Sequence, residues 1–151
     1  MVGVVHKFYD KMSLYLVLEL VPAGHLLGAI RKRGPFDNAT AAFYFANIVC
    51  GLDFLHSHHI AHRDLKPENI LMGSDGYLCI ADFGYAMHEI DDDDVDWKRQ
   101  GTPAYMPPEV VSGSGFLPRS ADWWAAGCVL YEMVCRNLVG STRHSYFVPA
   151  F

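Results

Sequence analysis

HRDLKPEN at residues 62–69 and DFG at residues 82–84 are the two stretches that decide how this chain is interpreted. Taken separately, the first fits a surface turn and the second fits a chance tripeptide. Their order, and their separation by the length of a single hairpin, instead favour one shared site. Between them they supply carboxylates, an amide and an ammonium group, which are the groups that transfer of a phosphoryl group from a metal-bound triphosphate requires.

Four charged or amide side chains in these stretches have candidate roles. Asp64 is predicted to accept or orient the proton of the attacking hydroxyl, and Lys66 to contact the transferring phosphate. Asn69 and Asp82 are predicted to hold Mg²⁺, because Mg²⁺ takes few protein oxygens and completes its shell with substrate phosphates. The hairpin between the two stretches should bring Asn69 and Asp82 back to the same end.

Further motifs extend the pattern to a known family. GTPAYMPPE at residues 101–109 resembles the substrate-docking segment of serine/threonine protein kinases, which ends in Ala-Pro-Glu, with Pro107 here in place of the alanine. Lys66, two residues after the aspartate, is the serine/threonine form of the loop. DWW at residues 122–124 and Glu19 in the hinge resemble the cyclic-nucleotide-dependent (AGC) group.

The resemblance implies an α+β, protein-kinase-like fold, mostly the helical large lobe with a remnant of the small-lobe antiparallel sheet. It implies a partial kinase domain over residues 1–135, in which residues 1–21 are small-lobe strands and hinge and residues 22–135 are part of the large lobe. Residues 136–151 no longer resemble the family and are expected to form an unmatched C-terminal tail.

The resemblance also implies ATP and Mg²⁺ as cofactors and protein serine or threonine as the acceptor. Thr102 would steady the substrate hydroxyl and the catalytic loop. The implied nucleotide contacts, beside Asp82, are Leu18 as a bulky gatekeeper, then Glu19, Val21, Glu68, Leu71 and Gly84. Glu68 also matches an acidic contact to substrate, whereas His25 stands where the group has a glutamate for the ribose and for basic substrate side chains.

Periodicity and turn residues predict the elements. In chain order they are strands near residues 4–5 and 14–18, a helix at 26–33, a long helix from 38 to about 56, strands at 70–72 and 77–80, and a final long helix. Asp37 should cap the long helix, which is apolar nearly all round and so expected to be buried. Ser120 can cap the final helix, while Asp122 either interacts with the helix macrodipole or, as the family implies, anchors the catalytic loop.

Some family features are not found in these 151 residues. No Gly-x-Gly-x-x-Gly precedes the hinge, and no lysine lies in a Val-Ala-x-Lys strand. The chain on its own is therefore expected to be a truncated core with weak or no kinase activity, arising from a partial gene model. The alternative function is a non-catalytic, kinase-like binding module.

The segment before Gly101 departs from the family in its charges. The resembling group phosphorylates a threonine three residues before this glycine, and the phosphate clamps the arginine that matches Arg63. Lys98 occupies that position here, and no serine or threonine lies between Gly84 and Gly101. The acidic residues 91–94, with Asp96, could supply the missing negative charge; the other interpretation is a solvated acidic loop.

Composition limits the remaining classes. The net charge of −5 gives no indication of a basic surface for nucleic acid. The sequence shows no signal peptide and no apolar stretch long enough to predict a membrane span. The four cysteines lie in apolar surroundings without Cys-x-x-Cys spacing, which predicts buried, reduced thiols in a cytoplasmic or nuclear protein.

A cluster of histidines is interpreted as a polar helix end plus a loop residue rather than a zinc site. Its members are His56, His58, His59 and His62. The oligomeric state is not predicted.

Overall fold

The structure is a computed structural model that describes residues 1–91 and 93–137, and it has the expected α+β architecture. Three antiparallel strand pairs form its small sheets, β1–β2, β3–β6 and β4–β5. The strands are β1 (Val4–Tyr9), β2 (Leu14–Leu18), β3 (Ile60–Ala61), β4 (Ile70–Met72), β5 (Leu78–Ile80) and β6 (Met87–His88). The α-helices are α1 (Leu26–Arg33), α2 (Asn38–Ser57), α3 (Pro108–Ser112) and α4 (Pro118–Cys135), with 3₁₀ turns η1 (Pro67–Asn69) and η2 (Pro103–Tyr105).

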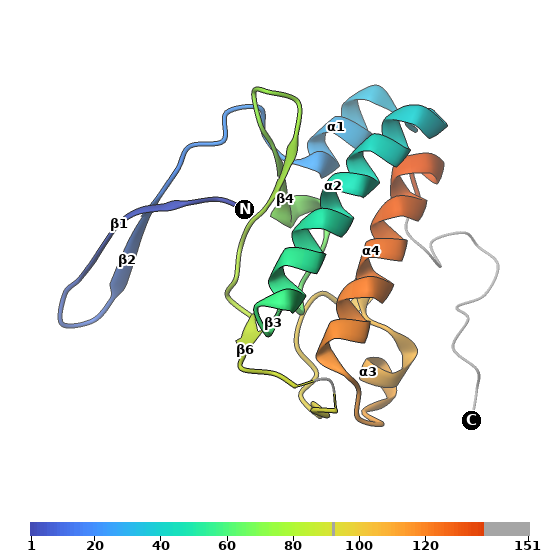
Figure 1. Cartoon of the computed structure of the whole chain (residues 1–151). Coiled ribbons are helices and arrows are strands. Elements are labelled where there is room, and N and C mark those ends of the chain that lie inside the picture. The colour runs from blue at the N-terminus through green and yellow to red at the C-terminus, as the bar shows by residue number, and fades with distance from the viewer. Residues whose placement is uncertain (92, 138–151) are drawn as a thin grey trace.

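The main hydrophobic core lies between α2 and α4, which run side by side in Figure 1. Ile48 and Leu52 of α2 and Val129 and Met133 of α4 are completely buried, and α1 adds Leu26 to the same cluster. Burial of side chains of this size contributes about 1.5–3 kcal/mol each. The core therefore fixes the relative position of α2 and α4. The polar loops lie at one end of this helix pair.

Burial of α2 all round was expected and is wrong, because only one face meets α4 and β5. Phe43 and Phe54 on its other face are 44% and 47% exposed. By length and composition alone α2 could cross a membrane, a test that core helices of soluble proteins also pass.

The ends of the helices follow from local chemistry, with one exception. Asp37 caps α2 as expected, its Oδ1 accepting a hydrogen bond from the Thr40 amide at 2.8 Å. His25 caps α1 in the same way through Nδ1, which accepts from the Gly28 amide at 3.1 Å. The expectation that Ser120 caps α4 is wrong: Pro118, whose φ suits a first helical position, begins the helix after Leu117.

The hairpin β4–β5 has the expected form. Ile70 pairs with Ile80, and the turn closes with a 2.8 Å hydrogen bond from the Gly73 amide to the Tyr77 carbonyl. One residue beyond the strands, the Ala81 amide donates to the Asn69 carbonyl at 2.8 Å. The hairpin thus places the residue before Asp82 directly against Asn69.

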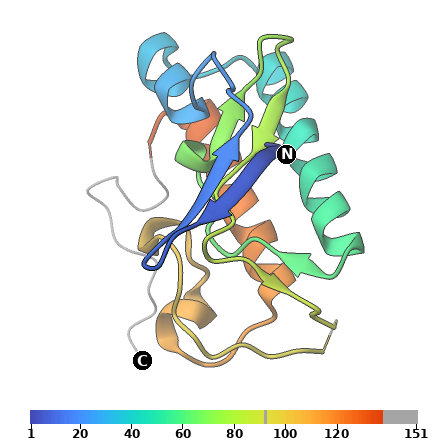
Figure 2. The ribbon, with the colours of Figure 1, turned by 90° about the vertical axis from the view of Figure 1, so that its left-hand side faces the viewer.

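The first two strands form a hairpin that projects from the rest of the molecule in Figure 1 and faces the viewer in Figure 2. Both strands were expected, and every residue in them is exposed. Its base is joined to the β4–β5 hairpin by a hydrogen bond of 3.2 Å from the Val2 amide to the Ile80 carbonyl.

The four cysteines are free thiols, but burial of all of them was a wrong expectation. Cys128 is buried in the core, whereas Cys50 and Cys135 are exposed on α2 and α4. Apolar neighbours in sequence did not indicate burial here, because both helices carry exposed apolar side chains, among them Phe54 of α2 and Trp124 of α4. Of the expected tail, residues 138–151 lie outside the described residues.

Candidate active site

Asp122 anchors the loop that carries Asp64. It lies in the first turns of α4, is fully buried, and accepts hydrogen bonds from the His62 amide at 2.8 Å and the Arg63 amide at 2.7 Å. His56 of α2 contacts the same carboxylate through Nε2 at 2.8 Å. The anchoring role is confirmed over the macrodipole role. His56 lies in the last turn of α2, as the helix-end interpretation expected, but its ring is nine-tenths buried against Asp122.

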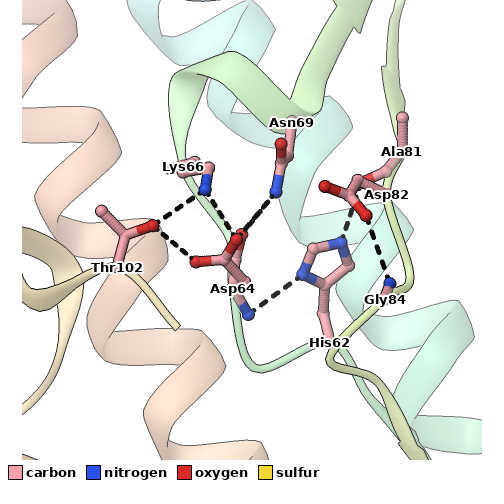
Figure 3. A network of polar contacts seen from close by, with 8 residues as sticks. All are labelled: His62, Asp64, Lys66, Asn69, Ala81, Asp82, Gly84 and Thr102. Carbon is pink, nitrogen blue, oxygen red and sulfur yellow. Dashed lines mark hydrogen bonds and ion pairs between the residues drawn. The ribbon is translucent and has the colours of Figure 1, made fainter. Parts of the chain in front are cut away.

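His62 connects the two motifs that the sequence singled out. Its ring is fully buried, with Nε2 3.0 Å from the Ala81 carbonyl and Nδ1 accepting from the Asp64 amide at 3.3 Å (Figure 3). This pair of partners requires the neutral tautomer with its proton on Nε2. The ring also meets Phe83 edge to face at 5.2 Å between centroids. One imidazole therefore sets the spacing between residues 62–69 and 82–84.

Two backbone conformations at the site are unusual. Arg63 has φ 64° and Asp82 has φ 62°, both in the left-handed region that residues with a Cβ rarely occupy. Such conformations cost of order 1–3 kcal/mol each and persist where surrounding contacts enforce them. Here the enforcing contacts are the Asp122 carboxylate on the Arg63 amide and the hydrogen bond from the Gly84 amide to Asp82 Oδ1, at 3.2 Å.

Asp64 lies at the centre of a network of side chains, and its own side chain is 3% exposed. Thr102 donates its hydroxyl to Oδ1 at 2.7 Å, and Lys66 pairs with Oδ2 at 2.7 Å. The Lys66 ammonium also donates to the Thr102 hydroxyl at 2.8 Å, so that the three groups form a closed triangle in Figure 3. Asn69 completes the network, its amide nitrogen donating to Asp64 Oδ2 at 3.2 Å and to the Asp64 carbonyl at 2.9 Å.

The donor set fits a magnesium ion that is completed by substrate phosphates. The side-chain nitrogen of Asn69 donates to Asp64, so the side-chain oxygen Oδ1 of Asn69 is the atom left to bind a cation. Asp82 offers an exposed carboxylate nearby (Figure 3). Within residues 1–91 and 93–137, no group of three or more His, Cys, Asp or Glu could hold a metal. Two oxygen ligands suit Mg²⁺, which is commonly held by one or two carboxylates and by phosphates.

The residues predicted to contact adenine differ in how firmly other parts of the chain hold them. Leu71 forms a bridge with His25, and the neighbouring Met72 amide donates to the Gly24 carbonyl at 2.8 Å, so β4 lies against the hinge. Leu18 is 49% exposed in the projecting hairpin. The Glu19 carboxylate accepts a hydrogen bond from the Gly3 amide at 3.2 Å.

Val21 is half-buried three residues before Gly24, and Glu68 is exposed in η1. The structure thus brings together Asp64, Lys66, Asn69 and Thr102, with Asp82 and Gly84 beside them. The nucleotide contacts of the remaining residues stay predictions.

Sequence reasoning missed a buried, hydrogen-bonded pair of side chains close to Thr102. Tyr105 of η2 donates its hydroxyl to Glu132 of α4 at 2.6 Å, and both residues are buried. Burial, followed by the hydrogen bond to Glu132 and its charge, raises the pKa of Tyr105 well above its ordinary value. Burial, with the charge of Glu132, also raises the pKa of the Cys128 thiol. No motif signals this pair, because it joins positions 27 residues apart in sequence.

The comparisons with known proteins agree with this geometry. The sequence profile described as "Protein kinase domain" matches residues 1–146. The cAMP-dependent protein kinase catalytic subunit PRKX of Homo sapiens is 43% identical over 127 residues, covering 84% of this chain and 34% of the relative. The cAMP-dependent protein kinase catalytic subunit of Arthrobotrys oligospora is 43% identical over 128 residues, covering 85% of this chain and 24% of the relative.

A third relative is the cGMP-dependent protein kinase of Toxoplasma gondii, 45% identical over 137 residues, which cover 91% of this chain and 13% of that protein. The chain thus spans about a third of the length of these three relatives, or less. The similarity to cyclic-nucleotide-dependent kinases of the AGC group is confirmed, and the loop, its anchor and the carboxylate network lie inside the matched range. The chain belongs to the protein kinase domain family.

Proposed function

We propose that this chain carries the phosphoryl-transfer centre of an ATP-dependent serine/threonine protein kinase. The observation that supports it most is the buried Asp64 carboxylate, held by Thr102 at 2.7 Å and by Lys66 at 2.7 Å. A carboxylate with fixed partners on both oxygens is oriented before any substrate arrives, and positioning of this kind accounts for much of kinase catalysis.

Each residue then has a defined task. Asp64 orients the acceptor hydroxyl and takes up its proton, while Lys66 places a positive charge beside the transferring group. Thr102 holds the side chains of Lys66 and Asp64 in position, since its hydroxyl hydrogen-bonds to both. Asn69 and Asp82 would hold Mg²⁺. That ion, when bound with ATP, neutralises charge on the phosphates.

We further propose that these 151 residues, taken alone, transfer phosphate slowly. They contain no glycine-rich loop and no strand lysine to contact the nucleotide phosphates. Each lost contact of that type costs about 2–4 kcal/mol of transition-state stabilisation, so several together lower the rate by many powers of ten. Binding of ATP through Asn69 and Asp82 alone would also be weak.

The test is transfer of labelled phosphate from Mg-ATP to a serine-containing protein by the purified chain. The expected result is slow incorporation that Asp64→Asn abolishes and that Asp94→Asn, a change in an exposed carboxylate, leaves unchanged. Rapid incorporation would contradict the proposal that the chain alone is slow. Incorporation that Asp64→Asn does not alter would contradict the assignment of the centre. Nucleotide binding without any transfer would favour the non-catalytic binding module.

A further inference from the structure

The guanidinium of Arg63 is enclosed by acceptors from the segment that precedes Gly101. Its Nε donates to the Tyr85 carbonyl at 2.7 Å, and one Nη donates to Gln100 Oε1 at 2.7 Å. The other Nη forms an ion pair with Asp96. The side chains of Arg63 and Asp96 are only 11% and 8% exposed. A cation removed from water to this degree requires a charged partner, because an unpaired buried charge is costly.

Asp96 is itself fixed by backbone hydrogen bonds. Its amide donates to the Phe116 carbonyl at 2.8 Å, and the Phe116 amide donates back to the Asp96 carbonyl at 3.0 Å. Its Oδ1 accepts from the Lys98 amide at 2.9 Å, which leaves Oδ2 directed at Arg63. The other acidic residues nearby behave differently: the Asp94 carboxylate is exposed and accepts from the Asp91 amide at 2.8 Å. Of the two sequence interpretations, a solvated acidic loop describes Asp94, and a counter-charge for Arg63 describes Asp96.

The ion pair is coupled to the catalytic aspartate by a close backbone approach. Gly101 has φ 107°, and a Cβ built on it would lie 2.5 Å from the Arg63 carbonyl oxygen. The chain therefore passes directly over the Arg63 backbone before Thr102 reaches Asp64. Holding Arg63 and Asp96 together holds this crossing in place, and with it the hydroxyl that contacts Asp64.

We propose that Asp96 is a positioning residue that docks the segment 96–102 onto the catalytic loop, so that the site is ordered without a phosphorylated serine or threonine between Gly84 and Gly101. The inference rests on the proposed function. Its basis is that the negative charge is encoded in the chain and buried against Arg63, while no serine or threonine lies between Gly84 and Gly101.

The test is amide hydrogen exchange in the purified 151-residue chain, followed at residues 96–102 and, as an internal reference, at the core of α2. Asp96→Asn keeps the shape of the side chain but removes its charge. It should accelerate exchange at residues 96–102 about tenfold or more, the effect of losing a charged hydrogen bond, with exchange in α2 unchanged. Asp94→Asn is the matched control and should stay within about twofold of wild type. Asp96→Glu, which retains the charge, should recover most of the protection.

Gln100→Leu removes the neutral partner of the same guanidinium and should have a smaller effect than Asp96→Asn. If Asp96→Asn behaves like Asp94→Asn, or if Gln100→Leu opens the segment as much, then the charge of Asp96 does not dock it and the proposal is wrong. Exchange that rises equally in α2 would show a general loss of stability and would also overturn it. The readout requires no substrate, so it stays separate from the Asp64→Asn transfer assay that tests the proposed function.

Discussion

The loop of residues 62–69 and the β1–β2 hairpin differ in how their side chains are surrounded. The loop is built from polar groups that are buried and paired: His62, Asp64 and Asn69 are at most 7% exposed, and each has hydrogen-bond partners. The hairpin is built largely from apolar residues, yet all of its strand residues are exposed. The position of the loop is thus set by many long-range contacts, and that of the hairpin mostly by contacts within itself.

Inside the hairpin, local contacts keep the strands together. Phe8 and Tyr15 stack at 4.9 Å between ring centroids, and Asp10 closes the turn by accepting from the Met12 and Ser13 amides at 2.7 and 2.8 Å. An isolated two-stranded hairpin is marginally stable in water. The contrast predicts that substitutions in the loop and its supports lower stability strongly, and that those in the hairpin barely do.

The largest effect is expected for Asp122→Ala. It removes the acceptor of the His62 and Arg63 amides and the partner of His56, leaving buried donors unsatisfied. Each unsatisfied group costs about 1–3 kcal/mol, so a loss of about 3–5 kcal/mol in unfolding free energy is expected. Urea denaturation measures it, with Asp53→Asn on the exposed side of α2 as the control. A loss below about 1 kcal/mol would show that water or a local shift replaces the carboxylate.

A pair of leucine substitutions compares the two regions directly. Leu52→Ala empties a fully buried site in α2 and should cost about 2–5 kcal/mol, whereas Leu16→Ala, at a site 54% exposed in β2, should cost less than about 0.5 kcal/mol. Thermal or urea unfolding of the two variants checks the difference. Equal losses would mean that the hairpin is as well packed in solution as the core.

Tyr105→Phe is expected to have an intermediate effect, about 1–3 kcal/mol, because Glu132 stays buried without its donor. The pKa of Tyr105 is raised in the folded state, so its contribution to stability is complete below the unfolded pKa and is lost as pH rises above it. Tyrosinate absorbance should therefore show one tyrosine that ionises only as the protein unfolds in alkali. Tyr105→Phe should lack that late component, and a tyrosine titration unchanged by the substitution would contradict the assignment.

The smallest effect is expected at Asp10. Hydrogen bonds from the Met12 and Ser13 amides, and then from the Tyr15 hydroxyl, lower its pKa. Its stabilising contribution is therefore complete above the unfolded pKa and lost as pH falls through the lower, folded pKa. Acid should loosen the hairpin turn before it affects the core. NMR titration of the Asp10 carboxyl carbon measures the pKa, and loosening by acid that persists in Asp10→Asn would assign it to another group.

Local rules were enough to predict much of this fold. Asp37 as a cap, Gly34 as the end of α1 and the hairpin around residues 73–77 each depend on residues adjacent in sequence. The centre was also predictable, because Asp64, Lys66 and Asn69 lie within one short loop. The Ser120 cap failed because a proline nearby begins the helix earlier.

What sequence could not supply were contacts between distant positions. His56 with Asp122, Tyr105 with Glu132 and Gln100 with Arg63 join residues that no motif or period relates. Nor could charge alone distinguish Asp96 from Asp94, two residues away. Their difference arises from the backbone pairing of Asp96 with Phe116, which only the folded chain reveals.

The two-stranded form of the first sheet has a practical consequence for anyone purifying this chain. Among the residues that the structure describes, β1 and β2 pair with no other strand. Each therefore presents an outer row of backbone amides and carbonyls beside exposed Val, Leu and aromatic side chains. Open edges of this composition act as templates for strands of other molecules. Solutions should therefore scatter more light as protein concentration rises, and a lysine introduced on the outer edge of β2 should reduce that scattering.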